Sequence, residues 1–307
     1  MAGSGVLVRP VIRYKPANDF ALWSYRPNAG QAKRVLKQRI ITAVILAAVA
    51  LWALLGWNDF FFALFLLALT CGCGWEWSNL AAVAPRNLRI AYTAIVTITT
   101  AICLLMANSA MLAPLVLTGV ILWIAIVGDL LTRPVLSAEL QADGTTQIRW
   151  PLLAIASFLL LLSVCCIYYL RQAHGPGIVI FTIALVAAAD TGAYFSGKKF
   201  GKRKLAEQIS GGKTIEGAAG GMLLALILAV IACRYLAGEN ISAWSIFIMS
   251  VFAALISIAG DLYISRAKRT RDVKDSGTLL PGHGGVLDRF DGLLAAIPFI
   301  TFAALWM

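Results

Sequence analysis

Residues 242–264 have the sequence SAWSIFIMSVFAALISIAGDLYI, an apolar run of 23 residues in which Asp261 is the only charged side chain. An α-helix rises about 1.5 Å per residue, so about 20 apolar residues are enough to cross the hydrocarbon core of a bilayer. The run therefore predicts a transmembrane helix. Asp261 stands close to one end of that helix, away from the bilayer centre where a charge is most costly.

Eight further runs are similar to this one in length and composition. Of the 307 residues, 60% are hydrophobic and only 13% are charged, whereas about a quarter of the residues in soluble domains are charged. A soluble fold of this size has too small an interior to hide so much apolar surface. We therefore predict an all-α polytopic integral membrane protein with about nine transmembrane helices. Besides 242–264, the predicted spans are 40–57, 59–80, 90–106, 111–131, 151–170, 177–197, 217–236 and 287–306.

Basic residues gather in alternate loops, and this sets the predicted orientation. The first 39 residues contain eight Lys or Arg and a single acid, Asp19. With nine crossings, the strongly basic loops at 198–213 and 266–274 lie on the same side, which the positive-inside rule places in the cytosol. We predict a cytosolic N-terminus and a C-terminus on the outer side. The predicted organisation is a cytosolic tail at 1–39, transmembrane helices 1–4 at 40–131, a polar loop and the fifth helix at 132–170, and catalytic C-terminal helices at 177–307.

The net charge of +11 follows from these loops. Basic cytoplasmic loops attract the anionic headgroups of membrane lipids. No compact basic domain presents the charge to a nucleic acid, so we expect membrane lipids as partners and no nucleic acid.

Six acids lie at the predicted cytosolic ends of the spans. A charge at the bilayer centre costs about 2.5–3.5 kcal/mol on insertion scales, so acids within spans are functional candidates. We interpret Glu76 and Asp129 as solvated interfacial acids at helix ends. The other four stand in two polar blocks that suggest chemistry. They are Asp190, Asp261, Asp288 and Asp291.

A secondary transporter of an anionic solute is the alternative from a different class of protein. Transporters keep binding charges near the membrane midplane, at broken helices of repeated halves. Here the acids cluster on the cytosolic side and the sequence has no internal repeat. Both observations favour an enzyme.

The first polar block, residues 187–221, has the sequence AAADTGAYFSGKKFGKRKLAEQISGGKTIEGAAGG. A basic loop follows Asp190, and the next helix is expected to open after the Gly-Gly-Lys-Thr segment at 211–214. Backbone amides at a helix start, together with lysines, suit a polyphosphate. A P-loop is rejected, because Glu207 stands where its first glycine would be and no buried strand precedes the segment.

The second polar block, residues 260–292, has the sequence GDLYISRAKRTRDVKDSGTLLPGHGGVLDRFDG. Asp261, Ser265 and Lys268 share one helical face by their i, i+4, i+7 spacing. Glycines in the turn at 281–285 let the backbone approach a ligand closely. Carboxylates alone would repel a nucleotide, but carboxylates with lysines suit a hard cation held between acids and phosphates. The two blocks therefore predict phosphoryl or nucleotidyl transfer at the cytosolic face, and no span offers a serine, a histidine and an acid for nucleophilic catalysis.

Both blocks closely resemble the signature of the phosphatidate cytidylyltransferases, also called CDP-diacylglycerol synthases. The resemblance lies at 265–269, 274–275 and 280–291, and in the Asp-x-Gly-Ala-Tyr, Phe-Gly-Lys and Ser-x-x-Lys-Thr-x-Glu-Gly patterns between 190 and 217. The Gly-Trp-Glu-Trp segment at 74–77 resembles the weaker N-terminal motif of the same family. The resemblance implies a membrane-bound nucleotidyltransferase of phospholipid biosynthesis, which converts CTP and phosphatidic acid to CDP-diacylglycerol and pyrophosphate.

The resemblance also implies roles for individual residues. It implies that Asp261, Asp288, Lys268 and His283 are catalytic, that Asp261 and Asp288 hold Mg²⁺, and that K⁺ is a candidate second cation. From the sequence alone His283 is a turn residue, a phosphate contact or a proton shuttle, and these alternatives stay open. The implied substrate-binding residues are Asp190, Lys204, Ser210, Lys213, Thr214, Glu216, Ser265, Arg269, Lys274, Asp275, Gly284, Gly285, Arg289 and Asp291.

The same resemblance implies a homodimer in the bacterial inner membrane, with an active site that faces the cytoplasm. A cytidylyltransferase that acts on another lipid phosphate, such as a polyprenyl or archaeal ether lipid, is the closest alternative. Helical pattern does not separate the two, because a groove for lipid chains is merely apolar.

Overall fold

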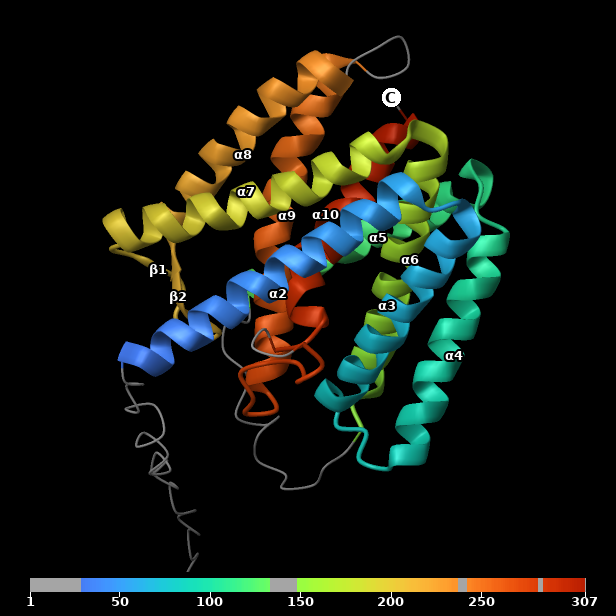
Figure 1. Ribbon diagram of the computed structural model, residues 1–307, viewed down its shortest axis with the longest axis horizontal. Coiled ribbons are helices and arrows are strands. Elements are labelled where there is room, and N and C mark those ends of the chain that lie inside the picture. Colours follow the sequence, from blue (N-terminus) through green and yellow to red (C-terminus); the bar gives the residue numbers. More distant parts are fainter. Residues whose placement is uncertain (1–28, 133–147, 237–241, 281–283, 307) are drawn as a thin grey trace, which may run out of the picture.

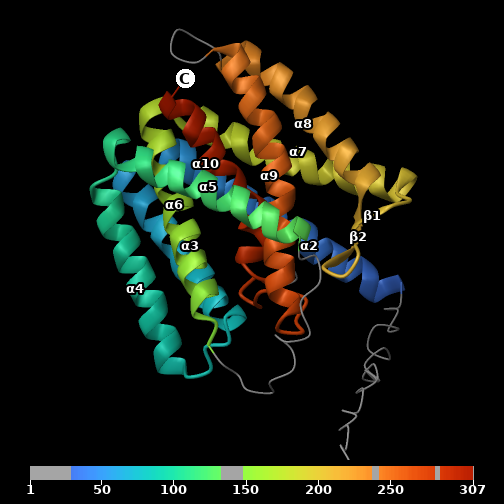
Figure 2. The same cartoon turned by 180° about the vertical axis from the view of Figure 1, so that it is seen from behind.

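The computed structural model describes residues 29–132, 148–236, 242–280 and 284–306, with the side chains of the first helix described from residue 41. Helices dominate the described chain (Figures 1 and 2). The elements are α2 (Ala29–Gly56), α3 (Asp59–Leu80), α4 (Arg86–Leu105), α5 (Ser109–Thr132), α6 (Trp150–His174), α7 (Pro176–Phe200), β1 (Lys204–Ala206), β2 (Ser210–Thr214), α8 (Ile215–Leu236), α9 (Ala243–Arg269) and α10 (Leu287–Trp306).

Eight helices of the described chain, α3 to α10, are long and apolar enough to cross a membrane. The described apolar part of α2, Ile41–Gly56, is shorter than these. The prediction of an all-α polytopic membrane protein is therefore confirmed, with the two-stranded hairpin β1–β2 as an addition. The ninth span and the orientation stay predictions.

Several helices extend beyond the predicted apolar spans, whereas α3 and α10 match them. α9 continues to Arg269 instead of ending at 264, and α2 begins at Ala29, inside the predicted tail. Apolarity marks only the part of a helix that meets hydrocarbon, whereas backbone hydrogen bonding continues until a cap ends it. The extension of α9 places Lys268 on the same continuous helix as Asp261.

The short turn between α2 and α3 is held by α6. Asn58 caps the first turn of α3 with its side chain. Arg171 of α6 donates to the carbonyl oxygens of Leu54, at 3.0 Å, and Trp57. Its guanidinium also forms an ion pair with Asp59 at 2.7 Å. A single arginine of α6 therefore fixes the short turn between α2 and α3.

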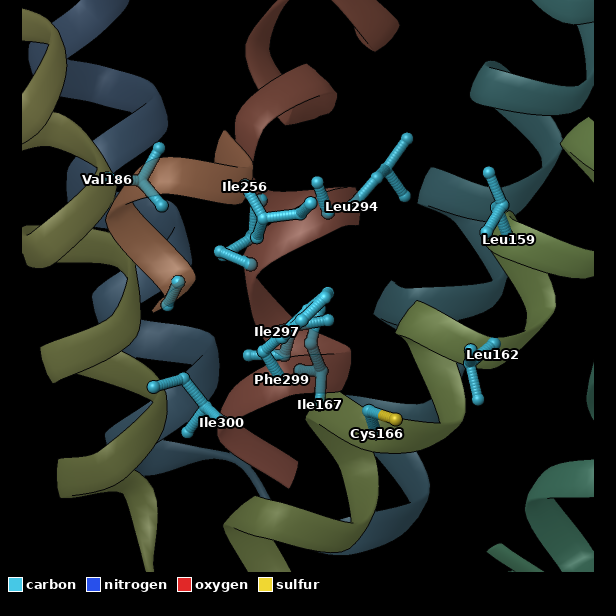
Figure 3. Close-up of a cluster of buried hydrophobic side chains, with 14 of the residues drawn as sticks. Leu159, Leu162, Cys166, Ile167, Val186, Ile256, Leu294, Ile297, Phe299 and Ile300 are labelled. Carbon is cyan, nitrogen blue, oxygen red and sulfur yellow. The ribbon is translucent and has the colours of Figure 1, made fainter. Parts of the chain in front are cut away.

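The core lies where α10 packs against α6, α7 and α9 (Figure 3). Every residue of α10 from 292 to 300 is buried. Figure 3 shows side chains of α10, among them Leu294 and Ile297, between those of α6 and those of α7 and α9. Ser163 of α6 adds a hydrogen bond to the carbonyl oxygen of Leu294 at 2.9 Å, a polar link of the kind that joins membrane helices.

Glycines bring α7 and α8 into backbone contact. A Cβ atom at Gly192 would lie only 2.6 Å from the carbonyl oxygen of Gly220 and 2.9 Å from Cα of Gly221. Small residues at a crossing let membrane helices approach this closely. The antiparallel hairpin β1–β2 connects α7 to α8, and Lys204 lies opposite Thr214 in it. The helix pair thus places this polar hairpin beside α9 (Figure 1).

Candidate active site

The two polar blocks meet at Asp261. Lys213 on β2 reaches across from the first block, and its Nζ lies 2.5 Å from Oδ2 of Asp261. Ser265, one turn further along α9, donates its hydroxyl to Oδ1 of the same carboxylate at 3.1 Å. The predicted shared face of Asp261 and Ser265 is thus confirmed, and both carboxylate oxygens have a partner.

Two further carboxylates lie near Asp261. Asp190 of α7 and Asp291 of α10 are close enough for their charges to interact with that of Asp261, and Lys213 interacts with both. The helices α9 and α10 approach each other closely here. A Cβ atom at Gly260 would lie only 2.5 Å from the carbonyl oxygen of Asp291, so glycine at this position permits the approach. Three carboxyl groups this close repel one another when they are ionised, and a hard divalent cation would offset that repulsion.

Asp288, in the first turn of α10, forms a second ion pair. Nζ of Lys268 lies 2.7 Å from its Oδ1, and the two side chains are only 12% and 8% exposed. Oδ2 accepts the backbone N–H of Ser276 at 2.9 Å and that of Gly285 at 3.0 Å. The carboxylate therefore ties the end of α9, the loop that follows it and the start of α10 together.

The carboxylates of the site fit Mg²⁺ only together with ligands from a substrate. Among the described residues, no group of three or more His, Cys, Asp or Glu side chains could hold a metal ion by itself. Mg²⁺ needs only one or two carboxylates when substrate phosphates supply other ligands. Asp261 meets this requirement. Asp261 and Asp288 both have their two oxygens engaged, so a cation would bind at Asp261 only after Lys213 turns away and at Asp288 only after Lys268 turns away.

Glu216 and Thr214 shape the junction between the hairpin and α8. Glu216 accepts the backbone N–H groups of Lys202 at 3.0 Å and Arg203 at 3.2 Å. The hydroxyl of Thr214 accepts the N–H of Gly217 at 3.1 Å, which satisfies a donor in the first turn of α8. Both side chains thus have partners within the protein, and their contact with a substrate stays a prediction.

The hairpin also contacts the end of α9. Nε of Arg269 donates to the carbonyl oxygen of Ile209 at 3.3 Å. Lys204 donates to the carbonyl oxygen of Gly211 at 2.6 Å, which closes the hairpin on itself, and Ser210 begins β2. The Gly-Gly-Lys-Thr segment lies inside β2 rather than after a buried strand, in agreement with the rejection of a P-loop.

The remaining predicted residues stand on or beside the loop between α9 and α10. Lys274, Asp275 and Arg289 are exposed. Gly284 has a φ of 79°, and a Cβ atom there would lie 3.2 Å from the side chain of Asp275, so glycine is the residue that fits. His283 lies outside the described residues.

The sequence interpretation of Glu76 as a solvated acid is wrong. The side chain was expected to be solvated, but it is 1% exposed. It accepts hydrogen bonds from the hydroxyl of Ser276 at 2.7 Å and from the N–H groups of Val286 and Leu287 at 2.9 Å. The interpretation failed because the covering loop lies 200 residues further along the chain. The one available signal was the resemblance of residues 74–77 to a family motif.

Asp129 behaves more as expected of an acid at a helix end. Its side chain is 38% exposed. It forms an ion pair with Arg266 of α9, one residue beyond Ser265. The pair links α5 to the helix that carries Asp261.

Comparisons with known proteins give a consistent result. The model of a family described as the cytidylyltransferase family matches residues 37–306, which include both polar blocks. A phosphatidate cytidylyltransferase of Pseudomonas aeruginosa is 39% identical over 272 residues, which cover 88% of this chain and 97% of the relative. The Haemophilus influenzae protein of the same name is 35% identical over 284 residues, with coverage of 87% and 98%. The Bacillus subtilis protein of that name is 41% identical over 145 residues, with coverage of 46% and 54%.

Proposed function

This chain belongs to the cytidylyltransferase family, and we propose that it converts CTP and phosphatidic acid to CDP-diacylglycerol and pyrophosphate in phospholipid biosynthesis. The observation that carries the proposal is the ion pair between Lys213 and Asp261, in which the lysine-rich block meets the carboxylate-rich block. Two anionic substrates require both kinds of group, cations to bind phosphates and acids to hold a metal ion.

The reaction joins two anions at one phosphorus atom. A phosphate oxygen of phosphatidic acid attacks the α-phosphorus of CTP, a new P–O bond forms, and the bond to the pyrophosphate leaving group breaks. The nucleophile is already an anion at neutral pH, so a general base has little to contribute. The protein has to align the two substrates and offset their charge, and positioning with electrostatic stabilisation dominates such phosphoryl-type transfers.

Lys213 and Lys268 are the cations best placed for this task. Each now forms an ion pair with a carboxylate, Asp261 or Asp288. A phosphate oxygen offers a lysine the same charge and hydrogen-bond acceptor as a carboxylate does. We propose that incoming phosphates draw the two ammonium groups away from the carboxylates. The other proposed substrate contacts are Asp190, Lys204, Ser210, Thr214, Glu216, Ser265, Arg269, Lys274, Asp275, Gly284, Gly285, Arg289 and Asp291.

The proposed metal ion is Mg²⁺, held by Asp261 and Asp288, with K⁺ as a second cation. Asp190 and Asp291 interact electrostatically with Asp261, and this supports a divalent cation at this place because it would offset the repulsion among the three carboxyl groups. When bound, Mg²⁺ would offset charge on the phosphates and on the pyrophosphate leaving group. The residues themselves bind and orient the two substrates.

We further propose a homodimer in the bacterial inner membrane, with nine spans, a cytosolic N-terminus and an active site that faces the cytoplasm. The basic residues of the hairpin and of the last turn of α9 support this orientation, since such residues favour the cytoplasmic side. The eight apolar helices and α2 support the number of spans.

An assay with labelled substrate tests the function. Purified protein is incubated with Mg²⁺, phosphatidic acid and CTP labelled in its cytosine. We expect the label to become soluble in chloroform, with release of an equal amount of pyrophosphate and with no transfer when phosphatidic acid is omitted. A parallel reaction with a polyprenyl phosphate tests the alternative lipid substrate. Correctly inserted protein that yields no chloroform-soluble label overturns the proposal.

A further inference from the structure

A buried carboxylate from the N-terminal half of the chain holds the loop between α9 and α10. Glu76 stands near the end of α3 and is 1% exposed. Its Oε2 accepts the hydroxyl of Ser276 at 2.7 Å and the N–H of Leu287 at 2.9 Å, and its Oε1 accepts the N–H of Val286 at 2.9 Å. A carboxylate is costly to bury unless hydrogen bonds replace its water, and the loop supplies these bonds.

Asp288 also holds this loop by hydrogen bonds. Its Oδ2 accepts the backbone N–H groups of Ser276 and Gly285. Ser276 therefore bonds to Asp288 through its backbone and to Glu76 through its side chain. The adjacent N–H groups of Gly285 and Val286 are divided between the two acids. The two carboxylates share their partners, so a displacement of one changes the setting of the other.

Gly277 and Gly285 of the loop pack tightly against Glu76. A Cβ atom at Gly277 would lie 2.5 Å from Oε1 of Glu76, and a Cβ atom at Gly285 would overlap both Glu76 and Ser276. Close-packed interiors transmit displacements instead of absorbing them. The loop therefore follows the position of this carboxylate.

We propose that Glu76 is a positioning residue for the proposed reaction: by holding Ser276, Val286 and Leu287 it sets the loop that orients Asp288 and its partner Lys268. The inference rests on the proposed function and deepens it. Glu76 touches no reacting group and acts through Asp288. It gives α3, which lies outside both polar blocks, a part in the active site.

Three variants separate positioning from a general contribution to folding. Glu76→Gln keeps the size of the side chain but replaces one acceptor oxygen by an NH₂ group, which then faces another donor. Ser276→Ala removes one of the hydrogen bonds and leaves every backbone group in place. Thr70→Val is the matched control, because Thr70 is buried on the same helix and its hydroxyl donates to the carbonyl oxygen of Leu66 within α3.

The kinetic expectation is a loss in kcat. For Glu76→Gln we expect kcat to fall by about 10-fold to 100-fold, the loss typical when a hydrogen-bond partner that supports a site is removed. The KM for CTP should change little, because the lost interaction acts on the orientation of a group that assists the transition state. Ser276→Ala should show a smaller fall, and Thr70→Val should keep the rate. The double variant of Glu76 and Ser276 should lose less than the product of the single losses, since the two residues share one hydrogen bond.

Amide hydrogen exchange provides a readout that does not depend on activity. In Glu76→Gln the N–H groups of Val286 and Leu287 should exchange faster, while those within α3 and α9 stay protected. A merely structural role predicts a lower Tm and faster exchange throughout the protein, with an unchanged kcat for the folded fraction.

The outcomes distinguish this inference from the proposed function. Wild-type protein that forms no CDP-diacylglycerol overturns the function, and the exchange at Val286 and Leu287 then still tests the hold of Glu76 on the loop. Active wild-type protein with an unimpaired Glu76→Gln variant overturns only the positioning role. If Glu76→Gln does not fold, Ser276→Ala decides: an unchanged kcat in that variant contradicts the inference.

Discussion

Nζ of Lys213 lies 2.5 Å from Oδ2 of Asp261, although one residue belongs to the hairpin before α8 and the other to the end of α9. The two side chains are 25% and 29% exposed. Neither charge is fully solvated, and neither is sealed from a substrate. The pair joins the basic block to the acidic one and is the natural place to begin mutagenesis.

Replacement of Lys213 by Met removes the charge and keeps most of the length of the side chain. We expect kcat to fall by about 10²-fold to 10³-fold, the usual cost of losing one preorganised partner of developing negative charge. Steady-state turnover of CTP in detergent measures the effect. Arg234→Met is the control, because Arg234 is an exposed cation in the last turn of α8, at the far end of the helix that follows Lys213. Equal losses in the two variants would contradict a specific role for Lys213.

Asp261→Asn and Asp288→Asn should each abolish turnover in protein that still inserts and purifies normally. Asparagine lacks the charge that a hard cation requires of its ligands. Titration calorimetry of Mg²⁺ into protein with CTP should show weaker binding in both variants. Asp59→Asn, which removes a 61% exposed acid at the turn before α3, should keep the wild-type rate. A near wild-type rate for either Asp261→Asn or Asp288→Asn would refute the metal assignment.

Gly192→Ala should destabilise the α7–α8 pair. The added Cβ atom would lie 2.6 Å from the carbonyl oxygen of Gly220, and overpacking of this kind costs about 1–3 kcal/mol. Gly128 in α5 is the matched control, because no atom lies within 4 Å of its added Cβ. Gly128→Ala should be neutral or stabilise the protein by up to about 1 kcal/mol. Thermal unfolding in detergent compares the two, and equal Tm values would contradict the close packing.

A topology reporter tests the orientation. Alkaline phosphatase, which is active only outside the cytoplasm, should be active when fused after residue 307 and inactive when fused after Lys202. The basic loop before the hairpin favours the cytoplasm, and an odd number of spans puts the C-terminus on the other side from the N-terminus. Inactivity of the fusion after 307 would falsify the nine-span arrangement.

Much of the architecture could be predicted because the bilayer imposes a local requirement. The spans depend on length and apolarity within one segment, and the predicted limits of the last helix, 287–306, agree with α10. The shared face of Asp261 and Ser265 follows from helical periodicity and is confirmed by their hydrogen bond. Lys268, predicted on that face too, bonds instead to Asp288 on α10, because its long side chain reaches beyond its own helix.

The sequence by itself determined that this chain crosses a membrane and that its chemistry-bearing residues gather at helix ends, since helical rise and hydrocarbon thickness apply to each segment alone. The tertiary structure decided which of those residues meet. It joined Lys213 to Asp261 through the α7–α8 pair, and it buried Glu76 beneath a loop 200 residues away. No local period of the sequence encodes such contacts. They form only when distant segments pack together, and donors on one segment then reach a carboxylate on another.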